Sequence, residues 1–405
     1  MIKKPVTGDQ NFIKQLNRSV VLDAIRRHSP LSRTDIADLT GLNKATVSNL
    51  VRELQTEHLV QDVGEGRSHG GRRPQLLVFR KDAGYVLAGQ LDVHYLLMAL
   101  TNLDGQVVWK RRVSLPPNPS VDQVTETAAA ISREAEGAVD GTAPYGIIGV
   151  GLGIPGIVDH KNGMILRAPN LNWTDVPFRT LLSAKTGRPV VIDNDANCGA
   201  IAELRYGFGR DTANLLYVSI GTGIGVGIVA DGRLYRGGRG SAGEFGHTSL
   251  YPDGPQCTCG NRGCWELYAS VSALSRVFRQ KRGGTAGWPY DPSSWEELSA
   301  IKHLTDRGDR HALDALHHVG EYLGVGVSSL IQGLNPEAVI IGNDMALFGP
   351  SLLAVIRQEV RKRVFPFNQD HLILDVSRLG EDSVLIGASA MVVEQFFARV
   401  ETAHL

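Results

Sequence analysis

Three cysteines and a histidine form the group of residues with the most distinctive chemistry. Cys257, Cys259 and Cys264 stand in Cys-Thr-Cys-Gly-Asn-Arg-Gly-Cys, and His247 precedes them. Thiolates and an imidazole at such spacing are typical of a tetrahedral zinc site, and the glycines allow the backbone to wrap around the ion. Because four protein ligands leave no position for water, we expect a structural ion. The alternative is that the cysteines are free and buried.

A second group of residues has the chemistry to bind a sugar. Amides and carboxylates occur in stretches 169–173 and 192–197, and Glu244, His247 and Glu266 follow them. A sugar ring needs hydrogen-bond donors and acceptors around its hydroxyls. Each residue also has a simpler interpretation, since Asn and Asp cap turns and Glu266 could be a surface acid behind the cysteine loop.

These residues require an α/β framework to position them. The predicted strands are 85–91, 96–103, 107–115, 146–153, 215–220, 225–229 and 234–235, and the predicted helices are 121–137 and 196–206. The strand–turn–strand rhythm occurs twice. It predicts two similarly organised halves with a cleft between them.

The N-terminal residues have the spacing of a helix-turn-helix. Residues 12–28 are predicted to form a first amphipathic helix. Its apolar residues at helical spacing are Ile13, Leu16, Val20, Val21 and Ile25. Ser32 and Asp35 have the spacing of a capping box, which indicates a short second helix. Ala37 is small enough for a helix crossing, and Gly41 tolerates the turn.

A third helix is predicted to begin after Asn43, a favourable N-cap. The apolar residues of this helix are Val47, Leu50, Val51 and Leu54. Its exposed face would read the major groove. Candidate DNA contacts in this region are Arg33, Asn43, Lys44, Thr46, Ser48, Asn49 and Arg52. The alternative is an ordinary three-helix bundle with solvated polar positions.

A β-hairpin wing is predicted after the third helix. Residues 59–63 and 75–79 have strand character, and the segment between them is rich in glycine and arginine. Arg67, Arg72 and Arg73 suit phosphate or minor-groove contacts. The alternative is a flexible interdomain linker, and the two roles are compatible.

Charge is distributed unevenly along the 405 residues. Residues 1–80 contain 13 Lys and Arg and 8 Asp and Glu, which gives a net charge of +5; because the whole chain sums to zero, the remainder carries −5. A basic module on an acidic body favours a nucleic-acid partner. No signal peptide or membrane-spanning stretch is visible, so we expect a cytoplasmic protein without membrane contact.

The motifs together resemble the ROK family (repressors, open reading frames, sugar kinases) along essentially the whole chain. The motifs in family order are Ile154-Pro-Gly, Asn194-Asp, Ser219-Ile-Gly-Thr-Gly-Ile-Gly-Val-Gly and Cys-x-Cys-Gly-x-x-Gly-Cys. The segments that begin at Ser68, Leu234 and Cys259 look particularly similar to family members that repress xylose operons.

The resemblance implies a winged helix-turn-helix followed by a two-lobed, actin-like and hexokinase-like α/β domain. The expected boundaries are 1–82 for the DNA-binding domain, 83–192 with 385–405 for the N-lobe, and 193–384 for the C-lobe. The resemblance also implies the sugar contacts, which are Asn170, Asn194, Asp195, Glu244, His247 and Glu266. His247 would additionally bind the zinc ion.

One departure from the family separates a sensor from an enzyme. Family kinases carry Asp-x-Gly-Gly-Thr, whose backbone amides hold ATP phosphates. Here the stretch 92–95 reads Asp-Val-His-Tyr, so both glycines and the threonine are lost. Asp195, which matches the catalytic base of the kinases, would remain only as a sugar ligand. The glycines of 221–227 survive, which we interpret as structural.

We therefore expect a sugar-responsive repressor without phosphotransferase activity. A homodimer or homotetramer would bind palindromic operator DNA of a carbohydrate catabolic operon. D-xylose is the expected inducer, with glucose as a competitor or anti-inducer. The alternatives are a sugar kinase with an appended DNA-binding domain, and a sensor that responds to a protein partner such as a sugar-transporter component.

Overall fold

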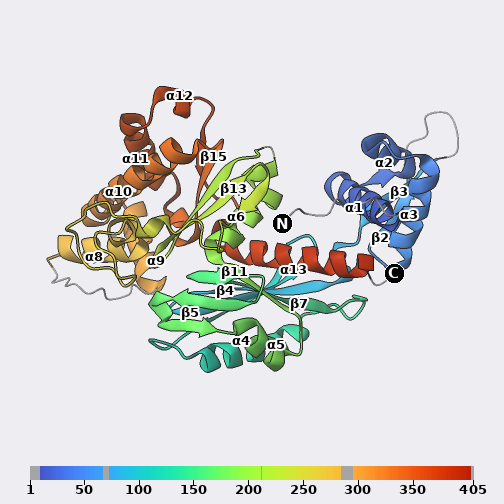
Figure 1. Ribbon diagram of the computed structural model, residues 1–405, viewed down its shortest axis with the longest axis horizontal. Helices are drawn as coiled ribbons and strands as arrows, with labels where there is room; N and C mark the ends of the chain where they lie inside the picture. The colour runs from blue at the N-terminus through green and yellow to red at the C-terminus, as the bar shows by residue number, and fades with distance from the viewer. Residues whose placement is uncertain (1–9, 67–72, 211, 284–294, 403–405) are drawn as a thin grey trace.

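The N-terminal domain combines three helices with a small antiparallel sheet. The computed structural model describes residues 10–66, 73–210, 212–283 and 295–402 (Figure 1). The domain's elements are α1 (Gln10–His28), β1 (Leu31–Ser32), α2 (Arg33–Thr40), α3 (Lys44–Thr56), β2 (Val60–Glu65) and β3 (Gln75–Phe79). The strand order is β1-β3-β2, which confirms the predicted helix-turn-helix and its wing. The pairing of β1 with β3 was not predicted.

Local signals fix the ends of α2 and α3 as expected. The Ser32 hydroxyl accepts a hydrogen bond from the Asp35 amide at 3.2 Å, and the Asp35 carboxylate accepts one from the Ser32 amide at 2.8 Å. Gly41 ends α2 at φ 70°, a left-handed conformation that favours glycine. Asn43 caps α3 by accepting a hydrogen bond from the Thr46 amide at 2.8 Å. The buried residues of α3 are Val47, Leu50, Val51 and Leu54.

The apolar face of α1 differs from the prediction. Val21 and Ile25 are fully buried, whereas Ile13, Leu16 and Val20 have exposed fractions of 51%, 55% and 40%. Arg18, in the same part of the helix, is only 4% exposed. Helical spacing therefore identified the helix, but it did not identify which of its residues are buried.

The N-lobe contains a five-stranded sheet in the order β11-β7-β4-β5-β6. Its strands are β4 (Tyr85–Leu91), β5 (Tyr95–Asn102), β6 (Val107–Ser114), β7 (Ile147–Ile154) and β11 (Val190–Asn194). Helices α4 (Val121–Glu136) and α5 (Phe178–Thr186) cover one face, and α13 (Ser383–Thr402) covers the other (Figure 1). A small separate sheet contains β8 (Ile157–Asp159), β9 (Met164–Ala168) and β10 (Trp173–Val176).

The C-lobe repeats the same topology, with the order β14-β13-β12-β15-β16. Its strands are β12 (Leu215–Ile220), β13 (Ile224–Ala230), β14 (Arg233–Tyr235), β15 (Ala338–Gly342) and β16 (Ile373–Val376). In both lobes, three antiparallel strands are followed by two strands parallel to the first strand of the lobe. The repeated order agrees with the predicted two similar halves.

Two helices pack between the N-lobe and C-lobe sheets, and further helices belong to the C-lobe. Helix α6 (Asp195–Tyr206) packs on β12 and β13 of the C-lobe sheet, and it also packs against α13. The two helices therefore form a layer between the lobes. The remaining C-lobe helices are α7 (Glu266–Ala269), α8 (Val271–Lys281), α9 (Trp295–Asp306), α10 (Arg310–Leu334), α11 (Gly349–Arg363) and α12 (Pro366–Gln369). In the described part of the chain, no helix is apolar over a length that would cross a bilayer.

Candidate functional site

A cleft between the two lobes brings together the polar residues singled out in the sequence. It encloses about 940 Å³ of empty space, including its open mouth. The six candidate sugar contacts all line it, namely Asn170, Asn194, Asp195, Glu244, His247 and Glu266. These residues come from four separate segments, so the tertiary fold assembles the group.

Asn194 has a structural role at this site. It ends β11 and caps α6, where its side-chain oxygen accepts hydrogen bonds from the amides of Ala196 at 2.9 Å and Asn197 at 3.2 Å. Its side-chain nitrogen donates to the Gly156 carbonyl at 3.0 Å. The turn-capping interpretation is therefore correct for Asn194, which keeps one N–H for a ligand in the cleft.

Asp195 is the first residue of α6 and lines the cleft. One of its carboxylate oxygens accepts a hydrogen bond from the Ser219 hydroxyl at 3.1 Å. Burial raises the pKa of Asp195 to about 6, and the negative charges of Glu244 and Asp92 act in the same direction. Above that pH, the carboxylate is an acceptor for a ligand hydroxyl.

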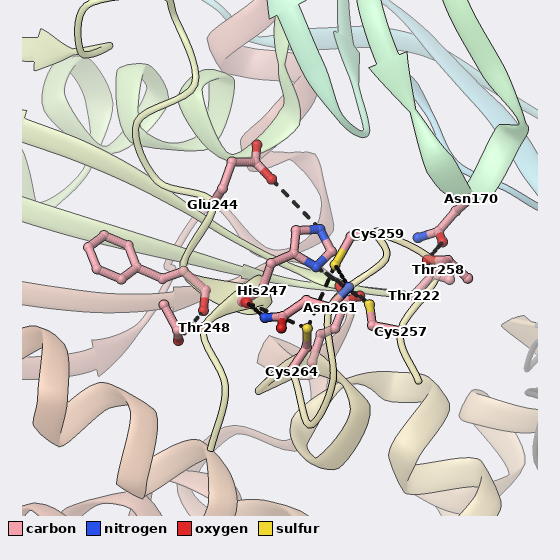
Figure 2. A network of polar contacts seen from close by, with 12 residues as sticks. Asn170, Thr222, Glu244, His247, Thr248, Cys257, Thr258, Cys259, Asn261 and Cys264 are labelled. Carbon is pink, nitrogen blue, oxygen red and sulfur yellow. Dashed lines mark hydrogen bonds and ion pairs between the residues drawn. The ribbon is translucent and has the colours of Figure 1, made fainter. Parts of the chain in front are cut away.

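His247, Cys257, Cys259 and Cys264 form a compact cluster beside the cleft (Figure 2). Their ligand atoms, one from each residue, all lie within 4.8 Å of one another. The Cys259 and Cys264 sulfurs are 3.8 Å apart, and the Cys257 sulfur lies 3.7 Å from His247 Nδ1. Zinc–sulfur bonds of about 2.3 Å in a tetrahedron place two sulfurs about 3.8 Å apart, so the cluster fits a zinc ion.

Short turns in the cysteine loop hold this arrangement. The Cys257 amide donates to the Asn261 carbonyl at 2.8 Å, and the Asn261 side chain donates to the His247 carbonyl at 3.0 Å. Gly263 has φ 61°, and a Cβ there would lie 1.7 Å from the Tyr251 carbonyl oxygen. Only glycine fits at this position, where the loop crosses another backbone segment.

His247 belongs both to the cysteine cluster and to the lining of the cleft, and Glu266 of the cleft contacts the cluster. His247 directs Nδ1 toward the cysteines, and its Nε2 lies 3.8 Å from the Glu244 carboxylate (Figure 2). Glu266 accepts a hydrogen bond from Cys257 Sγ at 3.2 Å, and it is only 8% exposed. The interpretation of Glu266 as a surface acid is therefore wrong. An ion in the cluster would fix the orientation of side chains that line the cleft.

The stretch 92–95 forms a tight turn at the other side of the cleft. The Asp92 amide donates to the Tyr95 carbonyl at 2.9 Å, and the His94 amide donates to the Asp92 carboxylate at 3.0 Å. Tyr95 is buried, and the Arg112 guanidinium stacks between its ring and that of Trp295, at 4.2 and 4.4 Å from the ring centres. Side chains occupy the region beside this turn.

Acidic groups lie next to the same turn. Burial raises the pKa of Asp92, and burial with repulsion from Asp92 raises the pKa of Asp344 to about 8. The raised pKa of Asp344 leaves this carboxyl group mostly neutral at neutral pH, so it adds little negative charge beside the turn.

Sequence reasoning missed two buried cleft residues that join the lobes. Gln90 in β4 donates to the side-chain oxygen of Asn343 at 3.1 Å, and Asn343 donates to Ser219 at 3.1 Å. Asn343 directly follows the apolar strand β15. Polar residues at the carboxyl ends of parallel strands commonly face ligand clefts, and this signal could have identified Asn343.

The candidate DNA contacts differ in their availability. Lys44, Asn49 and Arg52 are exposed on α3, and Thr46 and Ser48 are half-buried. The Arg52 guanidinium donates to the Asn49 side chain at 3.4 Å.

Other candidates in the DNA-binding domain already have protein partners or lie elsewhere. The Asn43 oxygen is used in capping, and Arg33 donates to Gln55 at 3.2 Å. Arg73 is exposed at the base of the wing. The predicted contacts Arg67 and Arg72 lie outside the described residues.

Comparison with known families identifies two regions of the chain. A model of the ROK family matches residues 89–395, and a model of the MarR family matches residues 15–68. A xylose repressor of Bacillus spizizenii is 38% identical over 393 residues, which cover 96% of this chain and 98% of the relative.

Solved structures give a consistent picture. A ROK family transcriptional regulator, a homolog of the E. coli MLC protein, aligns with a TM-score of 0.76 at 27% identity over 96% of this chain and 98% of its own. A ROK family glucokinase from Streptomyces griseus, in complex with glucose and AMPPNP, aligns with a TM-score of 0.67 at 28% identity. It covers 76% of this chain and 99% of its own.

Proposed function

The chain belongs to the ROK family, and we propose that it is a sugar-responsive transcriptional repressor of a xylose catabolic operon. The observation that carries this proposal is the union of a winged helix-turn-helix with a cleft lined by amides and carboxylates. Similarity to a regulator over 96% of the chain supports it. D-xylose is the proposed inducer because it appears in the name of a relative that matches the whole chain.

The six residues that line the cleft are proposed to bind the sugar hydroxyls. Asp195 and Glu244 supply carboxylate acceptors, and the free N–H of Asn194 is a donor. Asn170 accepts a hydrogen bond from Thr258 of the cysteine loop at 3.3 Å, which fixes its amide. The proposed domain boundaries are 1–82, 83–192 with 385–405, and 193–384.

We propose that the cysteine cluster holds a structural zinc ion. Four protein ligands leave no open coordination position, so the ion would not activate water. Its role would be to hold His247 and the loop that carries Glu266 and Thr258 against the cleft.

We propose that the protein is not an enzyme. Asp195 occupies the position of a kinase base, but His94 and Tyr95 stand where the turn of the kinases has glycines, and the Arg112 guanidinium packs on the Tyr95 ring. The second candidate function is a sugar kinase, favoured by the likeness to the glucokinase and by the retained glycine loop 221–225 at the cleft.

DNA binding is assigned to the N-terminal domain, and the protein would act in the cytoplasm, where its operator is. The proposed contacts are Arg33, Asn43, Lys44, Thr46, Ser48, Asn49, Arg52, Arg67, Arg72 and Arg73. One recognition helix reads one half-site, so a palindromic operator requires a homodimer or homotetramer.

A thermal-shift comparison of sugars tests the sugar assignment. A ligand that binds only the native state raises Tm with concentration. D-xylose should raise the Tm of the wild type and not that of Asp195→Asn, while glucose competes without displacing DNA. No Tm change with any pentose or hexose would contradict the proposal.

A further inference from the structure

Helix α13 runs from between the two lobes toward the DNA-binding domain (Figure 1). At its far end, the Phe397 ring lies 6.3 Å from that of Phe79, the last residue of the wing strand β3. The adjacent Phe396 ring lies 4.9 Å from the Tyr145 ring in an edge-to-face arrangement. Buried residues of the DNA-binding domain and of α13 belong to one continuous apolar cluster. The helix and the domain are thus packed as one unit.

At its near end, α13 is connected to the cleft by buried hydrogen bonds. Asp195 accepts from Ser219, and Ser219 accepts from the Asn343 side chain, each at 3.1 Å. The backbone amide of Asn343 donates to the Tyr217 hydroxyl at 3.0 Å. The same hydroxyl shares a 2.5 Å hydrogen bond with the hydroxyl of Ser383, the first residue of α13. The four residues beyond Asp195 are at most 5% exposed. Water therefore has little access to this chain of bonds.

The two lobes are both attached to this chain of bonds. Gln90 of the N-lobe sheet donates to Asn343, which belongs to the C-lobe. On α13 itself, Ser389 shares a 2.6 Å hydrogen bond with Thr101 of β5. A change in the angle between the lobes would therefore alter the bonds that hold α13.

Direct backbone contact adds a second connection between the cleft and α13. Gly387 packs against α6, and a Cβ at Gly387 would lie 1.7 Å from the Cys198 carbonyl oxygen. Helix α6 begins with Asp195. Because interiors are close-packed, a shift of α6 on ligand binding cannot be absorbed at this contact without movement of α13.

The far end of α13 leads to the recognition helix. Tyr145, which packs on Phe396, donates its hydroxyl to the Glu57 carbonyl at 2.7 Å. Glu57 is the C-cap residue of α3, and its carboxylate pairs with Arg18 of α1. A displacement of Phe396 would therefore reach the end of the helix that reads DNA.

We propose that α13 is the element that transmits sugar binding to the DNA-binding domain. In this proposal, which rests on the proposed function, Asn343, Tyr217 and Ser383 are positioning residues that connect the state of Asp195 to α13. Phe396 is the positioning residue at the other end. The sugar biases two arrangements of the lobes, and α13 moves the recognition helix between them.

The test compares operator affinity with and without D-xylose in full-length variants. The probe is a fluorescent duplex enriched by the wild type from a random DNA library, and anisotropy gives its Kd. The variants are Tyr217→Phe, Ser383→Ala, the corresponding double variant and Phe396→Ala. The matched control is Gln395→Ala, an exposed neighbour on α13. Calorimetry with D-xylose and Tm values are recorded for every protein.

In the wild type, saturating D-xylose should weaken operator binding about tenfold or more. The variants should still bind xylose, but the sugar should raise their operator Kd less than about threefold. Gln395→Ala should show the same rise in operator Kd as the wild type. The effects of Tyr217→Phe and Ser383→Ala on the xylose response should not be additive in the double variant, because both substitutions remove the same hydrogen bond. If these residues had only a structural role, the substitutions would lower Tm, and xylose would still raise the operator Kd as it does in the wild type.

Two results would overturn the proposal in different ways. If the wild type responds to xylose and the folded variants respond equally, α13 does not transmit the signal, and the proposed function stands. If the wild type binds the duplex with the same Kd in the presence of D-xylose, the proposed function fails together with the coupling.

Discussion

The Arg112 guanidinium lies 4.2 Å from the centre of the Tyr95 ring. This cation–π pair stands beside the turn where family kinases keep glycines, and a second ring from α9 covers the other face of the guanidinium. The turn is thus bordered by packed side chains, and the six candidate sugar contacts line the cleft between the lobes.

Phosphotransfer should be absent. With ATP, magnesium and either xylose or glucose, a coupled assay should record no ADP release above the blank, because side chains replace the backbone cradle for phosphate. A ROK glucokinase in the same assay is the positive control. Sugar-dependent turnover by the wild type, lost in Asp195→Asn, would contradict the account.

The pH dependence of stability should reveal the buried Asp344. Its pKa is 3.8 in the unfolded chain and about 8 in the native state, so ionisation opposes folding. The favourable contribution of the neutral group is complete below pH 3.8 and is lost as pH rises through about 8.

Asp344→Asn stays neutral, so it should have a higher Tm than the wild type at alkaline pH. The difference should shrink as pH falls toward 3.8. Thermal melts of both proteins from acidic to alkaline pH measure this Tm difference. A Tm difference independent of pH would show that Asp344 ionises normally in the native state.

Metal content should be about one zinc per chain. Removal by a chelator, or Cys259→Ser, should lower Tm and weaken xylose binding about tenfold or more, because His247 loses its fixed orientation. Elemental analysis and calorimetry measure the two effects. Cys198→Ala, at the cysteine outside the cluster, should retain the ion. Full xylose affinity in a zinc-free protein would refute this role.

The recognition helix should determine operator affinity. Lys44→Ala and Arg52→Ala should each weaken operator binding about tenfold and reduce its salt dependence, because each removes a positive charge near phosphates. Xylose affinity should not change. Arg307→Ala removes the same charge from an exposed C-lobe position and should leave DNA binding intact. An equal loss of operator affinity in all three variants would indicate that DNA is attracted nonspecifically by the charge of the whole protein.

Local chemistry made much of the fold predictable. Ser32, Gly41 and Asn43 act on neighbouring backbone groups, so their types fix the ends of α2 and α3 wherever the domain packs. The cysteine cluster was equally accessible, because few other sites require three cysteines and a histidine at this spacing. Whether Leu16 is buried depends on tertiary contacts, which helical spacing does not reveal.

The cleft was predictable in its chemistry and less so in its connections. Asn194 lines the cleft, but its capping bonds depend on where β11 ends. Gln90 and Asn343 are far apart in sequence and meet only because the lobes come together. A single sequence gives no signal for that pairing.

The central claim is that sugar binding, without nucleotide, releases DNA. The most direct measurement is the anisotropy of a protein–operator complex during titration with D-xylose in the absence of ATP. We predict that the operator Kd rises about tenfold or more for the wild type and does not change for Asp195→Asn. An operator Kd that stays constant with xylose and with every other pentose and hexose would contradict the account.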